Sequence, residues 1–512
     1  MDVAVAACNR LAAAAAVRLG EMGGNAVDAA LAAAFVSQVS EPGICALTGA
    51  AYLTVGRPGE DPVTVDGGVA MPGIGLAEDR FGRGVESVWM EYGGGVSATV
   101  GYGSVATPGA VAAYAAAHRR FGRVPWAEVV EPAVEVAREG FPLGHASAYY
   151  LAYVHESIFG RSPDSYRALH DETGALLAEG SPVRVPHLAG SLEMIAKEGA
   201  AALYTGELAD CVVADMAAHD GLLTAADLAV YRPAVRPALR VSAGGWQFGT
   251  NPPPAIGGAV LAAMLTLMAG HPGGPWSPAD LAHMVAVQEV VLSHRRDRLD
   301  TAVDRGAAAR ELLALVATGD PVAWEAPSTL NVSVVDAEGN ACAVTASDGY
   351  GSGVMVPGTG LWLNSALGEP ELNPHGLHAL TPGDRLASNM APTVGRRPDG
   401  AVLAVGSPGA DRITTALLQV LAGFTSGGLS LDAAIRWPRL HVRVSADGPV
   451  VEHEEDLKLP PIELPTRAHH PLAMYFGGVG AALSEPDGLL TAAGDPRRSA
   501  AVAISDRKHS QN

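Results

Sequence analysis

The most constraining feature of this chain is a pair of short runs of β-branched residues on either side of a turn. Residues 329–336 and 341–347 flank a Glu-Gly-Asn turn, and this pattern predicts an antiparallel hairpin. If the strands pair directly across the turn, Thr329 faces Ser347 with Cβ atoms roughly 5 Å apart. The sequence therefore predicts that two hydroxyl groups meet at the open end of the hairpin.

Thr329 is a candidate nucleophile. A threonine hydroxyl is a poor nucleophile until a base removes its proton. The nearest base would be its own α-amino group, which titrates at about pH 8, if the bond after Ser328 were cut. The preceding residues 300–327 contain the breakers Gly306, Gly319-Asp320-Pro321 and Ala326-Pro327, as suits a loop that is cut. A purely structural strand threonine is the alternative.

Composition excludes several classes of protein. The chain has 512 residues, of which 48% are hydrophobic, and this is ample for a large core. Its net charge of −20 argues against binding to nucleic acid, which needs clustered cations. The sequence contains no run of 18 or more apolar residues, so no membrane-spanning segment is expected. The first residues have no basic stretch, so we expect a cytoplasmic protein.

The sequence gives no metal or cofactor signal. The four cysteines form no C-x-x-C pair, and no H-E-x-x-H motif is present. Residues 101–106 loosely match a dinucleotide fingerprint, but Thr107-Pro108 stands where the helix of that motif should continue. We therefore expect no cofactor, no metal and no disulfide framework, with a dinucleotide-binding enzyme as an alternative.

Local patterns indicate mixed α and β structure. Residues 3–7 resemble a strand, and Asn25 is a plausible N-cap for an alanine-rich helix through Val36. Apolar residues at helical spacing predict further helices, over 109–121, 126–139, 188–198, 208–219 and 259–268. Further strands are predicted after the hairpin, over 401–405, 450–452 and 500–504.

Motif blocks run nearly from end to end in one order. They include Gly23-Gly24-Asn25-Ala26-Val27-Asp28, Ala106-Thr107-Pro108-Gly109, Pro252-Pro253-Pro254-Ala255-Ile256-Gly257-Gly258, Met390-Ala391-Pro392-Thr393, Gly406-Ser407-Pro408-Gly409-Ala410 and Gly494-Asp495-Pro496-Arg497-Arg498. In these blocks and around Thr329 the chain resembles the γ-glutamyltransferase family of N-terminal nucleophile hydrolases. The resemblance implies an α+β fold, a four-layer αββα sandwich.

The resemblance also implies self-processing. A large segment, 1–328, and a small segment, 329–512, would stay together as a heterodimer in one intertwined body after cleavage. Thr329 would form an acyl-enzyme with a small-molecule amide or γ-glutamyl-like substrate and pass the acyl group to water or an amine. The alternatives are an amide side-chain acylase, a C–C bond cleaving relative in specialised or antibiotic metabolism, and a catalytically silent scaffold.

Family positions suggest residues for the active site. By resemblance, the backbone amides of Gly409 and Ala410 form the oxyanion hole, where the family usually has two glycines. Alanine cannot adopt a positive φ at low cost, so Ala410 keeps this role only if its backbone conformation is ordinary. Ser347 would hydrogen-bond the amine of the nucleophile, and the hairpin register reaches the same residue independently.

The predicted substrate contacts depart from the family pattern. Ser388 and Asn389 lie where the family has two serines that help to hold the substrate carboxylate. Asn364 and Glu369 lie in the block that normally holds the α-amino group. The family arginine for the α-carboxylate is absent, because Gly68 occupies its position. Without this bidentate cation, efficient use of a glutamyl substrate is in doubt.

Overall fold

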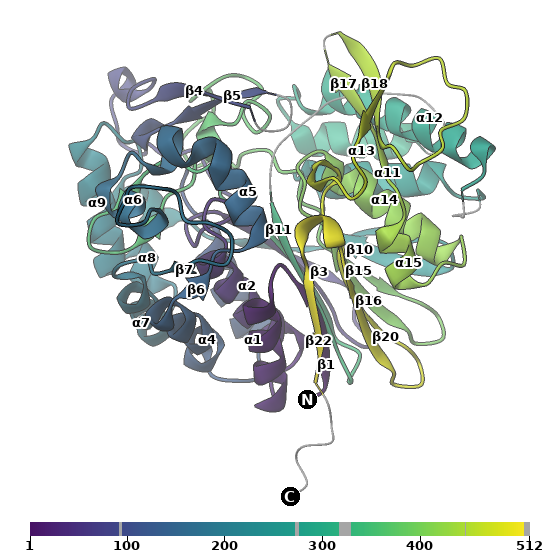
Figure 1. The fold of residues 1–512 in the computed structure, drawn as a ribbon, viewed down its shortest axis with the longest axis horizontal. Coiled ribbons are helices and arrows are strands. Elements are labelled where there is room, and N and C mark those ends of the chain that lie inside the picture. The colour runs from purple at the N-terminus through teal and green to yellow at the C-terminus, as the bar shows by residue number, and fades with distance from the viewer. Residues whose placement is uncertain (92–94, 272–275, 317–328, 446, 506–512) are drawn as a thin grey trace, which may run out of the picture.

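Two stacked β-sheets lie between two layers of helices in the computed structural model (Figure 1). The structure describes residues 1–512 except 92–94, 272–275, 317–328, 446 and 506–512. The predicted α+β class and four-layer αββα sandwich are confirmed. The predicted cut after Ser328 lies at the edge of the residues that are not described, and it stays a prediction.

The first sheet has seven strands. Their order is β22 (Ala501–Ile504), β1 (Val3–Ala7), β11 (Leu330–Asp336), β12 (Ala341–Ser347), β2 (Ala50–Gly56), β3 (Val63–Gly67) and β8 (Ala234–Pro237). Strands β11 and β12 form the predicted hairpin, with Leu330 opposite Ala346 and the amide of Asp336 donating to the carbonyl of Asn340 at 3.0 Å. This register places Thr329 and Ser347 next to each other at the open end. The predicted register is confirmed.

The second sheet has six strands and faces the first. Their order is β21 (Leu490–Gly494), β20 (Gly480–Ser484), β16 (Val402–Gly406), β15 (Thr393–Arg396), β10 (Trp246–Thr250) and β9 (Leu239–Ala243). Small side chains such as Ala343 and Ala404 fill the space between the sheets. Strands from both sides of position 328 pair in both sheets, so the two predicted segments share one core.

Helices cover the outer face of the first sheet. They are α1 (Arg10–Glu21), α2 (Ala26–Ser40), α3 (Ala110–Phe121), α4 (Trp126–Glu139), α5 (His145–Val154), α6 (Pro163–Leu169), α7 (Leu188–Glu198), α8 (Ala201–Tyr204), α9 (Glu207–Ala218) and α10 (Ala225–Val230). Helix α2 is buried along its whole length, as suits its alanine-rich sequence. Asn25 caps this helix as predicted, because its side chain accepts from the amides of Val27 and Asp28.

A second group of helices covers the other sheet on the opposite side of the molecule (Figure 1). They are α11 (Ile256–Leu267), α12 (Pro278–His294), α13 (Arg305–Val316), α14 (Arg412–Thr425) and α15 (Leu431–Arg436). None of the helices within the described residues is long and apolar enough to span a lipid bilayer. The region of the loose dinucleotide match forms a short turn, Tyr102–Ser104, and the next helix begins only at Ala110.

Smaller elements complete the fold. The strands are β4 (Glu86–Met90), β5 (Val96–Val100), β6 (Phe141–Pro142), β7 (Pro182–Val183), β13 (Met355–Val356), β14 (Leu361–Trp362), β17 (Leu440–Ser445), β18 (Gly448–Glu454) and β19 (Thr466–His469). Short helical turns are η1 (Glu78–Arg80), η3 (Tyr102–Ser104), η4 (His155–Phe159), η5 (Arg295–Leu299), η6 (Ala366–Gly368), η7 (Met474–Phe476) and η8 (Pro496–Arg498).

Candidate active site

Thr329 lies where the central strands of the first sheet end. Strand β1 runs antiparallel to β11, so the last residues of β1 lie beside the first residues of β11. The side chain of Thr329 is buried, but it lines two separate cavities. A nucleophile at this position can therefore meet a reactant from either of two sides.

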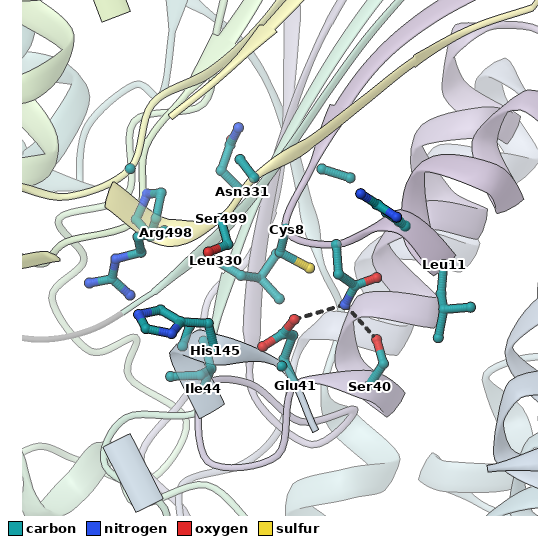
Figure 2. A pocket seen from close by; sticks show the side chains of 18 of the residues that line it. Cys8, Leu11, Ser40, Glu41, Ile44, His145, Leu330, Asn331, Arg498 and Ser499 are labelled. Atoms are coloured by element: carbon teal, nitrogen blue, oxygen red, sulfur yellow. Dashed lines mark hydrogen bonds between the residues drawn. The ribbon is translucent and has the colours of Figure 1, made fainter. Parts of the chain in front are cut away.

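The two cavities differ greatly in size. The Ser388 cavity, lined by Thr329, Ser347, Ser388, Asn389, Glu369, Tyr52 and neighbouring residues, has a volume of about 40 Å³. This is room for about three water molecules. The Glu41 cavity, lined by Thr329, Glu41, Arg498, Cys8, His145 and neighbouring residues, has a volume of about 350 Å³ (Figure 2). Only the second is in the size range of ordinary small-molecule sites.

Four predicted residues besides Thr329 meet around the Ser388 cavity: Ser347, Ser388, Asn389 and Glu369. Ser347 lies at the end of β12, and its hydroxyl accepts from the amide of Gly349 at 3.2 Å. The carbonyl of Ser388 accepts from the first amides of α11, Ile256 at 2.8 Å and Gly257 at 3.1 Å, which fixes the segment that also carries Asn389. Their roles toward a substrate stay predictions.

Glu369 reaches the same cavity as a buried carboxylate. Among the described residues it has no cationic partner. Burial and the neighbouring carboxylates of Glu371 and Asp348 raise the pKa of Glu369 well above its usual value. Burial likewise raises the pKa of Asp348 to about 7. The carboxyl group of Glu369 is thus buried without a compensating cation among the described residues that line the cavity.

The buried carboxyl of Asp348 makes stability depend on pH. Its pKa is about 7 in the folded protein against an ordinary value of 3.8. The folded state therefore binds the proton more tightly than the unfolded state does. The stability that this contributes is lost as the pH rises through the pKa of the folded protein. We expect Asp348→Asn to be more stable than the natural protein at pH 9 by roughly 2–4 kcal/mol, and similar to it near pH 4. Urea unfolding across this range measures the difference.

Asp399→Asn is the matched control for that comparison. Asp399 is an exposed carboxylate whose pKa is lowered by its hydrogen bonds with Arg397 and Ala401. Its replacement should give no gain in stability at high pH. A gain at Asp348 that is equally large at pH 4 and pH 9 would contradict the proposed titration.

Asn364 lies away from both cavities. Its amide nitrogen donates to the carbonyls of Thr48 at 2.8 Å and Ala106 at 2.9 Å. Its oxygen accepts from the amides of Ala106 at 3.0 Å and Ala366 at 3.1 Å. These four bonds use the side chain fully. The geometry therefore gives Asn364 a structural role in joining three loops and offers no support for the predicted substrate contact.

Tyr52 takes the space beside Gly68. A Cβ atom added to Gly68 would lie 2.3 Å from the hydroxyl of Tyr52 and 3.1 Å from Oδ1 of Asp66. Tyr52 comes from β2, and its hydroxyl interacts with the side chain of Ser388. No arginine, lysine or histidine is among the described residues that line the Ser388 cavity. A buried phenol thus fills the space beside Gly68, and the guanidinium of Arg385 donates to the Gly68 carbonyl.

The predicted oxyanion turn precedes α14. Gly409 has φ 124° and Ala410 has φ 65°, so both lie in the left-handed region. The condition set for Ala410, an ordinary backbone conformation, is therefore not met. Alanine adopts this conformation at a cost of about 1 kcal/mol, so the turn is kept rather than lost. Neither amide donates a hydrogen bond to another group within the described residues.

Close packing and ion pairs hold this turn in place. A Cβ on Gly409 would lie 2.6 Å from Cα of Gly477, so the approach of the two backbones requires glycine. The carboxylate of Asp411 lies 2.5 Å from Nη1 of Arg412 and 3.2 Å from Nε2 of His441. Although burial opposes the charge, the guanidinium of Arg412 and the contact with His441 hold the pKa of Asp411 below its usual range. The strained conformation therefore has a rigid support.

Sequence reasoning missed three residues that shape the site: Tyr52, Glu41 and Arg498. Arg498 belongs to a motif block that carries the family resemblance, but no local pattern indicates that Glu41 and Arg498 share a cavity. Within the described ranges, the structure has no group of three or more His, Cys, Asp or Glu side chains placed to hold a metal ion.

Comparison with known proteins identifies the family. The gamma-glutamyltranspeptidase family model matches residues 12–505. The acylase ACY 1 proenzyme of Pseudomonas sp. (strain V22) is 30% identical, over 94% of this chain and 90% of the relative. The glutathione hydrolase proenzyme of Pseudomonas aeruginosa is also 30% identical, over 86% of this chain and 82% of the relative.

Solved structures support the fold. Cephalosporin acylase from Bacillus halodurans superimposes with a TM-score of 0.81 at 24% identity, covering 98% of this chain and 95% of that chain. The family match across the chain also assigns it to the hydrolases and acyltransferases of the N-terminal nucleophile type. The chain therefore belongs to the gamma-glutamyltranspeptidase family.

Proposed function

We propose that Thr329 is the nucleophile of a self-processing hydrolase and acyltransferase. In the precursor its hydroxyl attacks the carbonyl of Ser328, the bond rearranges to an ester, and water hydrolyses the ester. This releases segment 1–328 and leaves a free α-amine on Thr329. The amine then serves as the base that activates the hydroxyl beside it.

In the mature enzyme the activated hydroxyl attacks a substrate amide. The developing oxyanion is stabilised by the amides of Gly409 and Ala410, which are worth about 3 kcal/mol each when they are already aimed at it. The departing amine takes the proton, and water or a second amine then releases the acyl group from Thr329. Ser347 holds the α-amine in place. The placement of Thr329 at the junction of two cavities carries this proposal.

Mass analysis and N-terminal sequencing of the purified protein test the proposal. The expected products are residues 1–328 and a fragment that begins at Thr329. Brief treatment with an amide substrate and acid quenching should add the mass of the acyl group to the second fragment alone. A fully active protein that remains one chain would overturn the proposal.

A non-glutamyl amide is the second candidate substrate. The observation that favours it is the Ser388 cavity, which has a volume of about 40 Å³ and has no cationic side chain among its described lining residues. The acylase relative is consistent with this chemistry. An assay of γ-glutamyl anilide beside glutaryl and acetyl anilides distinguishes the two, because a glutamyl enzyme should prefer the first.

A further inference from the structure

The Glu41 cavity has opposite charges on two of its walls. Glu41 lies just after helix α2, and Arg498 ends the turn η8 near the other end of the chain. Both side chains are largely buried, at 3% and 7% exposure, and both line the cavity together with Thr329. Figure 2 shows the Glu41 carboxylate and the Arg498 side chain on different sides of the space around Leu330.

The carboxylate of Glu41 accepts hydrogen bonds from two neighbouring side chains. Its Oε1 accepts from Nδ2 of Asn9 at 2.8 Å, and its Oε2 accepts from Oγ of Ser147 at 3.0 Å. No described cation lies within ion-pair distance of it. Each carboxylate oxygen can accept a further hydrogen bond. Two neutral donors therefore orient the group and leave it able to bind an ammonium group.

The turn that carries Arg498 is rigid. The neighbouring Arg497 donates to Glu454 at 2.8 Å and lies 3.2 Å from Asp495, all three groups being buried. The stem of Arg498 packs on Gly478, where an added Cβ would lie 2.7 Å from Cγ of Arg498. The guanidinium is thus positioned by packing of its stem, and a guanidinium is well suited to bind a carboxylate.

We propose that the Glu41 cavity binds the zwitterionic α-amino acid group of a reactant, with its ammonium on Glu41 and its carboxylate on Arg498. This group would lie on the side of Thr329 away from the Ser388 cavity, whose wall lacks a cation. The reactant is either the acyl donor or the amine that accepts the acyl group. The role in catalysis rests on the proposed function, whereas the binding itself does not.

Binding is measured with the full-length Thr329→Ala protein, which cannot turn over the probes. Three probes of matched chain length are compared by calorimetry: 2-aminopentanoate, pentanoate and 2-aminopentane. We expect 2-aminopentanoate to bind at least 10-fold more tightly than either probe with one charge. It is the only one of the three that carries both an ammonium group for Glu41 and a carboxylate for Arg498. Equal binding of 2-aminopentanoate and pentanoate would overturn the proposal.

Variants test the two walls separately. In Glu41→Gln the amide oxygen can still accept from Asn9 while the amide nitrogen donates to the Ser147 hydroxyl. Arg498→Met keeps the stem that packs on Gly478. Each should weaken 2-aminopentanoate binding at least 10-fold, with melting curves confirming the fold. Glu179→Gln is the matched control, because Glu179 lines the same cavity at its exposed rim and pairs with His145 at 2.8 Å. Unchanged binding in Glu41→Gln and Arg498→Met would refute the assignment.

The cut enzyme shows which reactant carries the group. If it is the donor, both variants raise KM for γ-glutamyl anilide at least 10-fold. If it is the acceptor, both lower the fraction of acyl groups transferred to 2-aminopentanoate rather than to water. If the enzyme is cut and active but shows neither of these effects, the result contradicts this inference and leaves the proposed function intact. An uncut chain that still binds the zwitterion would instead contradict the proposed function.

Discussion

Replacing Thr329 with alanine is expected to leave the chain uncut and to reduce amide hydrolysis by about 10⁵-fold. The side chain supplies the hydroxyl that would attack both the Ser328 carbonyl and the substrate. Removal of the nucleophile from an enzyme of this kind abolishes the covalent route, and only residual catalysis by binding and oxyanion donors remains. Denaturing electrophoresis with intact mass measures the first effect, and anilide hydrolysis measures the second.

Two variants make that result specific. Thr329→Ser keeps a hydroxyl and should still be cut. Thr345→Ala removes another buried threonine of the same hairpin, whose hydroxyl lies 3.4 Å from Oδ1 of Asn331. Its loss should cost about 1 kcal/mol of stability and leave processing intact. Cleavage of Thr329→Ala at the same bond would show that another group performs the reaction.

The part of the site set by local sequence could be predicted. A turn of three residues fixes the register of β11 and β12, so the meeting of Thr329 and Ser347 follows from counting along the strands. The cap at Asn25 is also local, because it needs only one side chain and the first turn of α2. Both features are present in the structure, because each depends only on residues close together in the chain.

The parts that depend on distant packing could not be predicted. Gly477 approaches Gly409 from a distant part of the chain, and no local pattern signals this approach or the left-handed backbone of the adjacent Ala410. The charges of Glu41 and Arg498 share a cavity only because β1 and β22 are neighbours in the sheet. In the same way, no local pattern near Gly68 indicates that the side chain of Tyr52 fills the space beside it.

Placing an arginine at position 68 is expected to damage the enzyme unless Tyr52 is removed as well. The first side-chain atom would lie 2.3 Å from the hydroxyl of Tyr52, which is buried and cannot move aside freely. Overpacking of this kind costs about 1–3 kcal/mol and more when a charge is buried with it. Gly68→Arg alone should therefore lower the melting temperature and γ-glutamyl anilide hydrolysis.

The double variant Tyr52→Ala/Gly68→Arg should show the opposite result. Removing the phenol opens the space that the arginine stem needs, and the guanidinium then supplies the cation that the Ser388 cavity lacks. Because a desolvated charge pair is worth about 2–5 kcal/mol, kcat/KM for γ-glutamyl anilide should rise at least 10-fold over Tyr52→Ala. Tyr52→Ala/Gly68→Met is the matched control, with a stem but no charge. If Gly68→Arg alone matches the natural enzyme in stability and glutamyl hydrolysis, Tyr52 is not the barrier to a glutamyl substrate.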